Sequence, residues 1–72
     1  MRHKIKMSEN KYQSRAILHL DDISMYAVLQ YPSGNYKILR PYSDREYMLA
    51  LLRRLSLTDE QKILFNEIIG GV

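Results

Sequence analysis

The fold of this chain is decided by residues 12–40, which read YQSRAILHLDDISMYAVLQYPSGNYKILR. Apolar and polar residues alternate over residues 12–20, the period-two pattern of a β-strand with one buried face. Asp21-Asp22 interrupts the alternation, and both residues suit a tight turn. Pro32-Ser33-Gly34-Asn35 is a second turn, in which glycine can adopt positive φ. Three strands are therefore expected, over residues 12–20, 23–31 and 36–40.

The two turns also predict how the strands pair. A two-residue turn at the paired aspartates sets Leu18 opposite Met25. A four-residue turn at the proline and glycine sets Leu29 opposite Ile38. Both pairings place the apolar residues of the central strand on one face, and a slip of one residue in either hairpin would move a whole set of side chains to the other face. The sequence thus predicts a self-consistent antiparallel meander.

Two capping boxes follow the meander. Ser43-Asp44-Arg45-Glu46 predicts a helix start, with Tyr42 and Tyr47 at the positions of a hydrophobic staple. Thr58-Asp59-Glu60-Gln61 predicts a second helix, which Gly70-Gly71 ends. The segment between the helices is short, so they are expected to form a hairpin. The predicted fold class is α+β: a three-stranded antiparallel β-meander followed by a two-helix hairpin packed on one face (βββαα).

The charge of the chain is unevenly distributed. Its formal net charge is +3. Residues 1–11 carry four cations, Arg2, Lys4, Lys6 and Lys11, against the single acid Glu9, a net of +3. From residue 12 onward seven Lys and Arg balance seven Asp and Glu. We therefore expect residues 1–11 to form a basic, flexible arm and residues 12–72 a single small domain.

Composition bears on location and assembly. The absence of cysteine favours a reducing compartment. No apolar run of the length of a signal peptide follows the basic start, and the longest apolar stretch, residues 47–52, is far short of the roughly 20 residues of a membrane span. A soluble cytoplasmic protein is expected. A chain of 72 residues buries a small core, so a second copy or a partner is expected to add stability.

The sequence offers little material for catalysis. It has two histidines, no cysteine, no glycine-rich phosphate loop and no nucleophile elbow. His19, Asp21 and Asp22 meet at the first turn, but acidic turns are common for conformational reasons, and a solvated hairpin tip is the favoured interpretation. We expect no enzymatic activity, no metal and no cofactor.

The second face of the meander is the leading candidate for function. Under the predicted register, six residues point away from the core and combine an apolar patch with basic side chains, as protein contact surfaces do. These predicted partner-binding residues are Arg15, Ile17, Tyr26, Val28, Lys37 and Leu39. Two plainer interpretations stay open: the helices or the arm cover this face, or its apolar residues are simply exposed.

Nucleic-acid binding is the alternative function. Cations of the arm and the first helix would contact phosphates, and the plainer interpretation of the arm is a solubilising tail. The residues concerned are Arg2, Lys4, Lys6, Lys11, Arg45, Arg53 and Arg54. The overall layout is generally similar to that of small non-enzymatic inhibitors carried by phages and mobile elements. That resemblance implies a regulatory protein that acts by docking, either on a protein partner or on a second copy.

Overall fold

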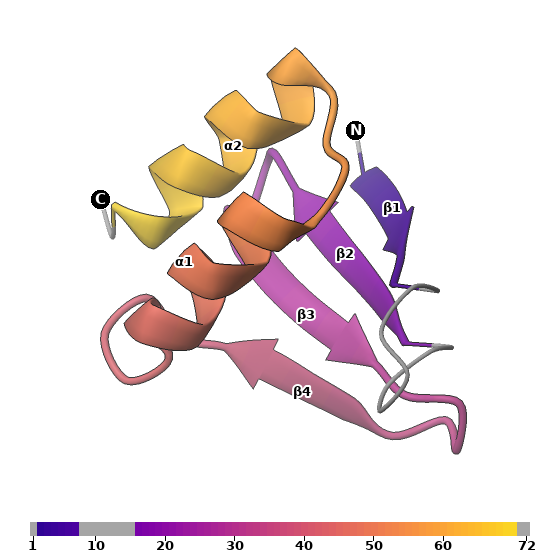
Figure 1. Cartoon of the computed structure of the whole chain (residues 1–72). Helices are drawn as coiled ribbons and strands as arrows, with labels where there is room; N and C mark the ends of the chain where they lie inside the picture. Colours follow the sequence, from indigo (N-terminus) through magenta and orange to yellow (C-terminus); the bar gives the residue numbers. More distant parts are fainter. Residues whose placement is uncertain (1, 8–15, 71–72) are drawn as a thin grey trace.

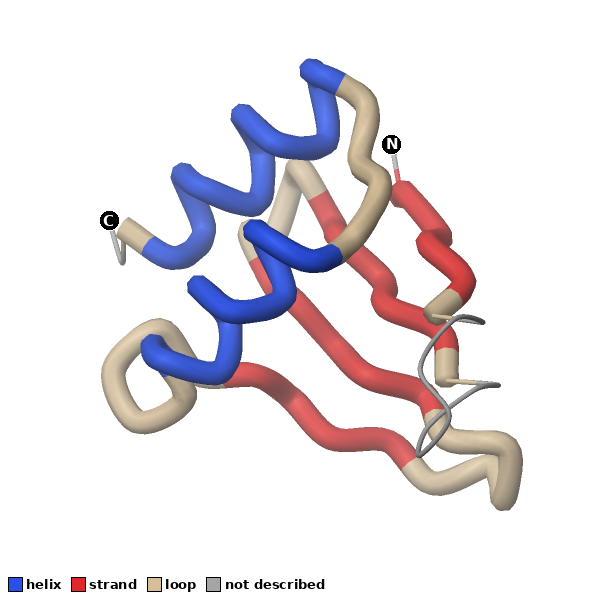
Figure 2. The backbone as a smooth tube through the Cα atoms, in the orientation of Figure 1, coloured by secondary structure: helices blue, strands red, loops and turns tan. Residues whose placement is uncertain are grey.

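Four antiparallel strands form one sheet, and two helices lie side by side over one of its faces (Figures 1 and 2). The computed structural model describes residues 2–7 and 16–70. The strand order is β1-β2-β3-β4. The elements are β1 Arg2–Lys6, β2 Ile17–Asp21, β3 Tyr26–Gln30, β4 Tyr36–Leu39, α1 Arg45–Arg54 and α2 Asp59–Ile69. The predicted α+β class is confirmed, but the prediction of three strands is wrong.

The additional strand is β1, which lies in the segment expected to be a basic arm. It pairs with β2 along its whole length, from Arg2 opposite Asp21 to Lys6 opposite Ile17. Ile5 is only 8% exposed, because its side chain faces the helices while its neighbours along the strand face away. One apolar residue among cations is a weak strand signal, and pairing with β2 outweighs it.

The first hairpin has a longer loop than predicted. Asp21 pairs with Tyr26, so the loop contains four residues rather than two. The Asp21 carboxylate accepts a hydrogen bond from the Ile23 amide at 2.9 Å, and its carbonyl accepts one from the Met25 amide at 2.9 Å. Leu18 consequently faces Leu29, not Met25. The register sum changes by four, an even number, so the residues of β2 and β3 keep their predicted faces.

The second hairpin departs from the prediction by one residue. The Gly34 amide donates to the Tyr31 carbonyl at 2.9 Å, and Gly34 has a φ of 94°. Tyr31 already pairs with Asn35 through a bond of 2.8 Å, which leaves a three-residue loop. Leu29 therefore faces Lys37 instead of Ile38. An odd shift exchanges the two faces of a strand, so β4 is inverted relative to the prediction.

The capping box predicted for α2 is confirmed, and the one predicted for α1 is wrong. Thr58 Oγ1 accepts from the Gln61 amide at 3.1 Å, and Gln61 Oε1 accepts from the Thr58 amide at 3.0 Å. The first helix begins at Arg45, with Asp44 rather than Ser43 at the N-cap. Tyr42 is 97% exposed, so the predicted hydrophobic staple does not form.

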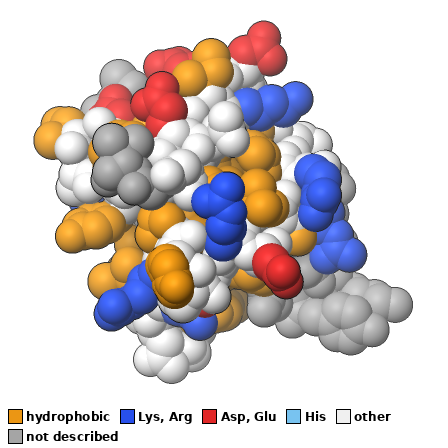
Figure 3. Space-filling model, turned by 90° about the vertical axis from the view of Figure 1, so that its left-hand side faces the viewer, with side chains coloured by type: hydrophobic (Ala, Val, Ile, Leu, Met, Phe, Trp, Pro, Cys, Tyr) orange, Lys and Arg blue, Asp and Glu red, His pale blue; other side chains and the backbone are white. Residues whose placement is uncertain are grey.

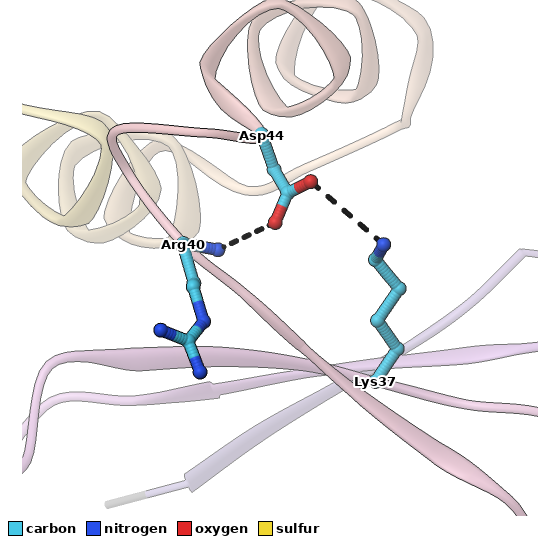
Figure 4. Close-up of polar contacts among 3 residues, drawn as sticks. All are labelled: Lys37, Arg40 and Asp44. Atoms are coloured by element: carbon cyan, nitrogen blue, oxygen red, sulfur yellow. Dashed lines mark hydrogen bonds and ion pairs between the residues drawn. The ribbon is translucent and has the colours of Figure 1, made fainter.

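Asp44 instead ties the start of α1 to β4 (Figure 4). Its Oδ2 accepts from the Arg40 amide at 2.9 Å, and its Oδ1 lies 3.8 Å from Lys37 Nζ. The Arg40 amide follows the last residue of β4, so a carboxylate replaces a strand partner there. A competing long-range contact thus displaces the local capping box.

The core lies between the sheet and the two helices. On the sheet side it contains Leu18, Leu20, Ala27 and Leu29, none more than 1% exposed, and α2 packs over β2 and β3. The buried residues are Ile5, Met7, Ala16, Leu18, Leu20, Ala27, Leu29, Leu39, Met48, Leu51, Leu57, Leu64, Phe65, Ile68 and Ile69. Since both helices use the same face, no helix of the described chain lies over the opposite face of the sheet (Figure 1).

Candidate functional site

The sheet face turned away from the helices is the candidate site, and we call it the outer face. In an antiparallel sheet, residues directly opposite each other point to the same side. The registers therefore give three rows across the strands, and each row can be read from β1 towards β4. The rows are Arg2–Asp21–Tyr26, Lys4–His19–Val28–Ile38 and Lys6–Ile17–Gln30–Tyr36.

The outer face exposes large apolar side chains next to basic ones. Tyr26 is 58% exposed, Tyr36 64% and Ile38 52%. Val28 and Ile17 between them are half-buried. All the cations of β1, namely Arg2, Lys4 and Lys6, are exposed at one border of this patch. Half-exposed aromatic residues beside cations resemble a binding surface more than a solvated sheet face, which is usually polar.

The structure retains part of the predicted partner-binding set and removes the rest. Ile17, Tyr26 and Val28 lie on the outer face, as the sequence predicted. Leu39 does not, because it is 1% exposed in the core. Lys37 lies opposite Leu29 on the helix side and forms its ion pair with Asp44. Both corrections have one cause, the three-residue loop that inverts β4. Arg15, like Lys11 of the alternative set, lies outside the described residues.

Tyr36 and Ile38 belong to the outer face, and sequence reasoning missed both. They occupy the places that the predicted register gave to Lys37 and Leu39. The signal that could have found them is the position of Gly34 as the last of three loop residues, with left-handed φ, before the strand resumes. The β1 cations were missed as members of this face because the segment was expected to be an arm.

The predicted nucleic-acid set is divided between two sides of the molecule. Arg2, Lys4 and Lys6 lie on the outer face. Arg53 and Arg54 lie at the end of α1, in the helical layer. The Arg45 side chain donates a hydrogen bond to the carbonyl of Ile69 at 3.0 Å and so joins the start of α1 to the end of α2. The helix arginines therefore do not extend the basic border of the outer face.

The outer face is electropositive. Three cations on β1 and one acid, Asp21, give it a formal charge of +2. Hydrogen bonds from the Ile23 backbone and then from Ser24 lower the pKa of Asp21, and the nearby charge of Arg2 acts in the same direction. Asp21 is thus ionised at neutral pH and offsets part of the β1 charge at one end of the face.

A hydrogen bond between His19 and Gln30 orders the middle of the face. His19 Nε2 and Gln30 Oε1 are 2.9 Å apart, so Nε2 is the donor. Neutral His19 then keeps its second nitrogen, Nδ1, as an acceptor, and this atom is buried with no hydrogen-bond partner among the described residues. The pair links β2 to β3 on the outer face and holds two polar side chains flat between the aromatic ones.

The face is hollowed near the Arg2 end. A depression of about 350 Å³ is lined by residues of all four strands and the first loop: Arg2, His19, Asp21, Ser24, Tyr26, Val28 and Tyr36. Its walls combine two aromatic rings with a guanidinium and a carboxylate. Hydrophobic side chains also reach the surface in several separate places on the side shown in Figure 3, so exposure alone does not define a site. The outer face differs in having concavity, aromatic rings and cations together.

Metal and membrane sites are absent from the described ranges, residues 2–7 and 16–70. No group of three His, Cys, Asp or Glu there could hold a metal ion. Neither described helix has the length and apolar character needed to cross a membrane. Comparison of the chain with family models, with curated proteins and with solved structures finds no match.

Proposed function

We propose that this chain is a small non-enzymatic interaction protein that docks its outer face onto a protein partner. The partner presents acidic side chains opposite β1 and apolar side chains opposite β3 and β4. The observation that carries the proposal is the exposure of Tyr26, Tyr36 and Ile38 beside the β1 cations. Buried aromatic anchors with a charged rim are the usual source of affinity in such contacts. Docking would regulate the partner by occupying its surface.

The middle of the face favours a protein over a nucleic acid. Ile17, Val28 and Ile38 are β-branched aliphatics, which pack against apolar side chains but offer no ring for a base to stack on. The β1 cations would neutralise about three phosphates, too few for tight binding at physiological salt. The one observation in favour of single-stranded nucleic acid is that these cations share a face with Tyr26 and Tyr36, so oligothymidylate is the competing ligand in binding tests.

The charge of the face favours a different protein over a second copy. Two outer faces brought together would each contribute a formal charge of +2. Like charges placed together at an interface disfavour association. A partner with an acidic surface gains from the same charges and is attracted from a distance.

Site-specific photocrosslinking tests the proposal. A photoreactive phenylalanine analogue replaces Tyr26 on the outer face or, as a matched control, Ile63 on α2. The two positions are 58% and 61% exposed. The expected result in the source cells is one protein adduct at position 26 that survives nuclease, is absent at position 63, and is reproduced by purified components. The Tyr26→Ser variant should bind the purified partner about tenfold or more weakly, the effect of losing an aromatic anchor.

Three results would contradict the proposal. Equal adducts at positions 26 and 63 would show that the outer face is not special. Adducts formed only with a second copy would replace the partner by a homodimer. Loss of the adduct after nuclease treatment would favour nucleic acid.

A further inference from the structure

We propose that the partner supplies an extended acidic segment that pairs with the open edge of β1 and adds a fifth strand to the sheet. This inference rests on the proposed function, because it specifies how the partner engages the basic border of the outer face. In the described part of the chain, β1 is at the end of the sheet and pairs with β2 alone. Its second edge therefore carries backbone donors and acceptors with no described strand beside them, a template for strand addition.

The side chains of β1 specify the chemistry of the added strand. Arg2, Lys4 and Lys6 lie on the outer face, while His3 and Ile5 lie on the helix side. Directly opposite residues interact in cross-strand pairs, and opposite charges are favoured there. The complementary segment thus alternates acidic residues, which pair with the cations, and apolar residues, which extend the packing of Ile5. Its pattern over five residues is acidic, apolar, acidic, apolar, acidic.

The same charges exclude pairing of β1 with a second copy of itself. A two-fold antiparallel pair centred on Lys4 would set Lys4 against Lys4 and Arg2 against Lys6. Any register that keeps Ile5 on the helix side places cations opposite cations, and such pairs are destabilising. Lysine on an edge strand is a known safeguard against self-association. Here the safeguard also acts as a selector, since it rejects basic and neutral strands in favour of acidic ones.

The other edge of the sheet is less suited to strand addition. The strand β4 has four residues, against five in β1. Asp44 crosses to its end, accepts the Arg40 amide and pairs with Lys37 (Figure 4). The cation on the helix side of β4 is thereby matched within the chain. The β1 cations on the outer face are matched within the described strands only at Arg2, which lies opposite Asp21.

Synthetic peptides test the inference on the full chain. The probe is a fluorescein-labelled peptide, Glu-Thr-Glu-Val-Glu-Thr-Glu. One control has the same composition with its acids contiguous, Glu-Glu-Glu-Glu-Thr-Val-Thr, and the other has lysine in place of glutamate. Fluorescence anisotropy gives affinities, and amide hydrogen exchange locates the contact. The alternating acidic peptide should bind about tenfold more tightly than the contiguous control and should protect amides of β1.

A charge-swap variant makes the test specific. The Lys4→Glu variant should lose affinity for the acidic peptide by about five- to tenfold and should gain affinity for the lysine peptide. The Lys62→Glu variant is the matched control, because it makes the same change of charge at an exposed position of α2. It should retain both affinities. If the Lys4→Glu variant unfolds, the Lys4→Gln variant should show the same loss at a smaller size.

Each contrary result overturns the inference in a recognisable way. Equal affinity for the alternating and contiguous acidic peptides would reduce the effect to net charge. No peptide binding, with the position 26 crosslink intact, would overturn strand addition and leave the proposed function standing. Binding of oligothymidylate above that of the peptide, with a log–log salt slope of about −2 for three phosphates, would overturn both proposals in favour of single-stranded nucleic acid.

Discussion

The two faces of the sheet have similar apolar content and opposite fates. On the helix side, Leu18 and Leu39 are at most 1% exposed. On the outer face, Tyr26 and Ile38 are more than half exposed. Aliphatic and aromatic residues therefore do not by themselves show which face is covered. The difference lies in their company, since the outer face interleaves them with cations, histidine and glutamine, which the helices could not bury without partners. A face left open with its apolar residues in place is the natural place to look for function.

Adjacent residues of β4 give the largest test of this contrast. The Leu39→Ala variant should lose about 2–5 kcal/mol of unfolding free energy, because it leaves a cavity in the core. The Ile38→Ala variant should lose less than about 1 kcal/mol, since half of its side chain is already in water. Urea denaturation of both variants measures the difference. Equal losses, or a larger loss at position 38, would restore the register predicted from sequence and undo the outer face.

The loop that orients β4 gives the next largest effect. Gly34 has a φ of 94°, and no atom lies within 4 Å of the place that a Cβ would occupy, so only backbone strain opposes a side chain there. The Gly34→Ala variant should lose about 1–2 kcal/mol, the cost of left-handed backbone for an L-residue. The Gly70→Ala variant serves as the control, because its φ of −60° is helical. Thermal denaturation that showed no greater loss at position 34 would contradict the three-residue loop.

The helical layer that covers one face depends on one real cap and lacks another. The Thr58→Ala variant should lose about 1 kcal/mol, since it removes the acceptor for the Gln61 amide. The Ser43→Ala variant should be close to neutral, because Asp44 occupies the N-cap of α1. Parallel chemical denaturation distinguishes them. A comparable loss at Ser43 would mean that the capping box predicted from sequence forms after all.

The smallest effect concerns pH at the edge of the outer face. Backbone amides lower the pKa of Asp21 in the folded state. A depressed folded pKa stabilises the protein above the ordinary pKa of aspartate, and this contribution is lost as the pH falls through the folded value. We expect an NMR titration of Asp21 below the ordinary range. The Asp21→Asn variant should keep the loop, through its amide oxygen, and lose that part of the acid dependence. A normal Asp21 titration would contradict the loop geometry.

The two hairpins show why sequence reasoning succeeded on one side of β3 and failed on the other. Both loop lengths were mispredicted. At the first loop, the Asp21 carboxylate supports four loop residues instead of two, and the even shift left every side chain on its predicted face. At the second loop, a difference of one residue exchanged Leu39 for Ile38. Turn residues announce that a turn exists, but its length depends on hydrogen bonds that several turn types can satisfy.

The alternating pattern of residues 16–30 by itself determined the α+β class, the two sets of side chains on β2 and β3, and the cap at Thr58. Periodicity and local hydrogen bonding depend on neighbours in the chain, so sequence suffices for them. Only the tertiary structure decided that Arg2–Lys6 is a strand, that β4 turns Leu39 inward, and that Asp44 serves β4 instead of a local cap. These choices depend on contacts between distant segments, whose free energy exceeds the weak local preferences that they override.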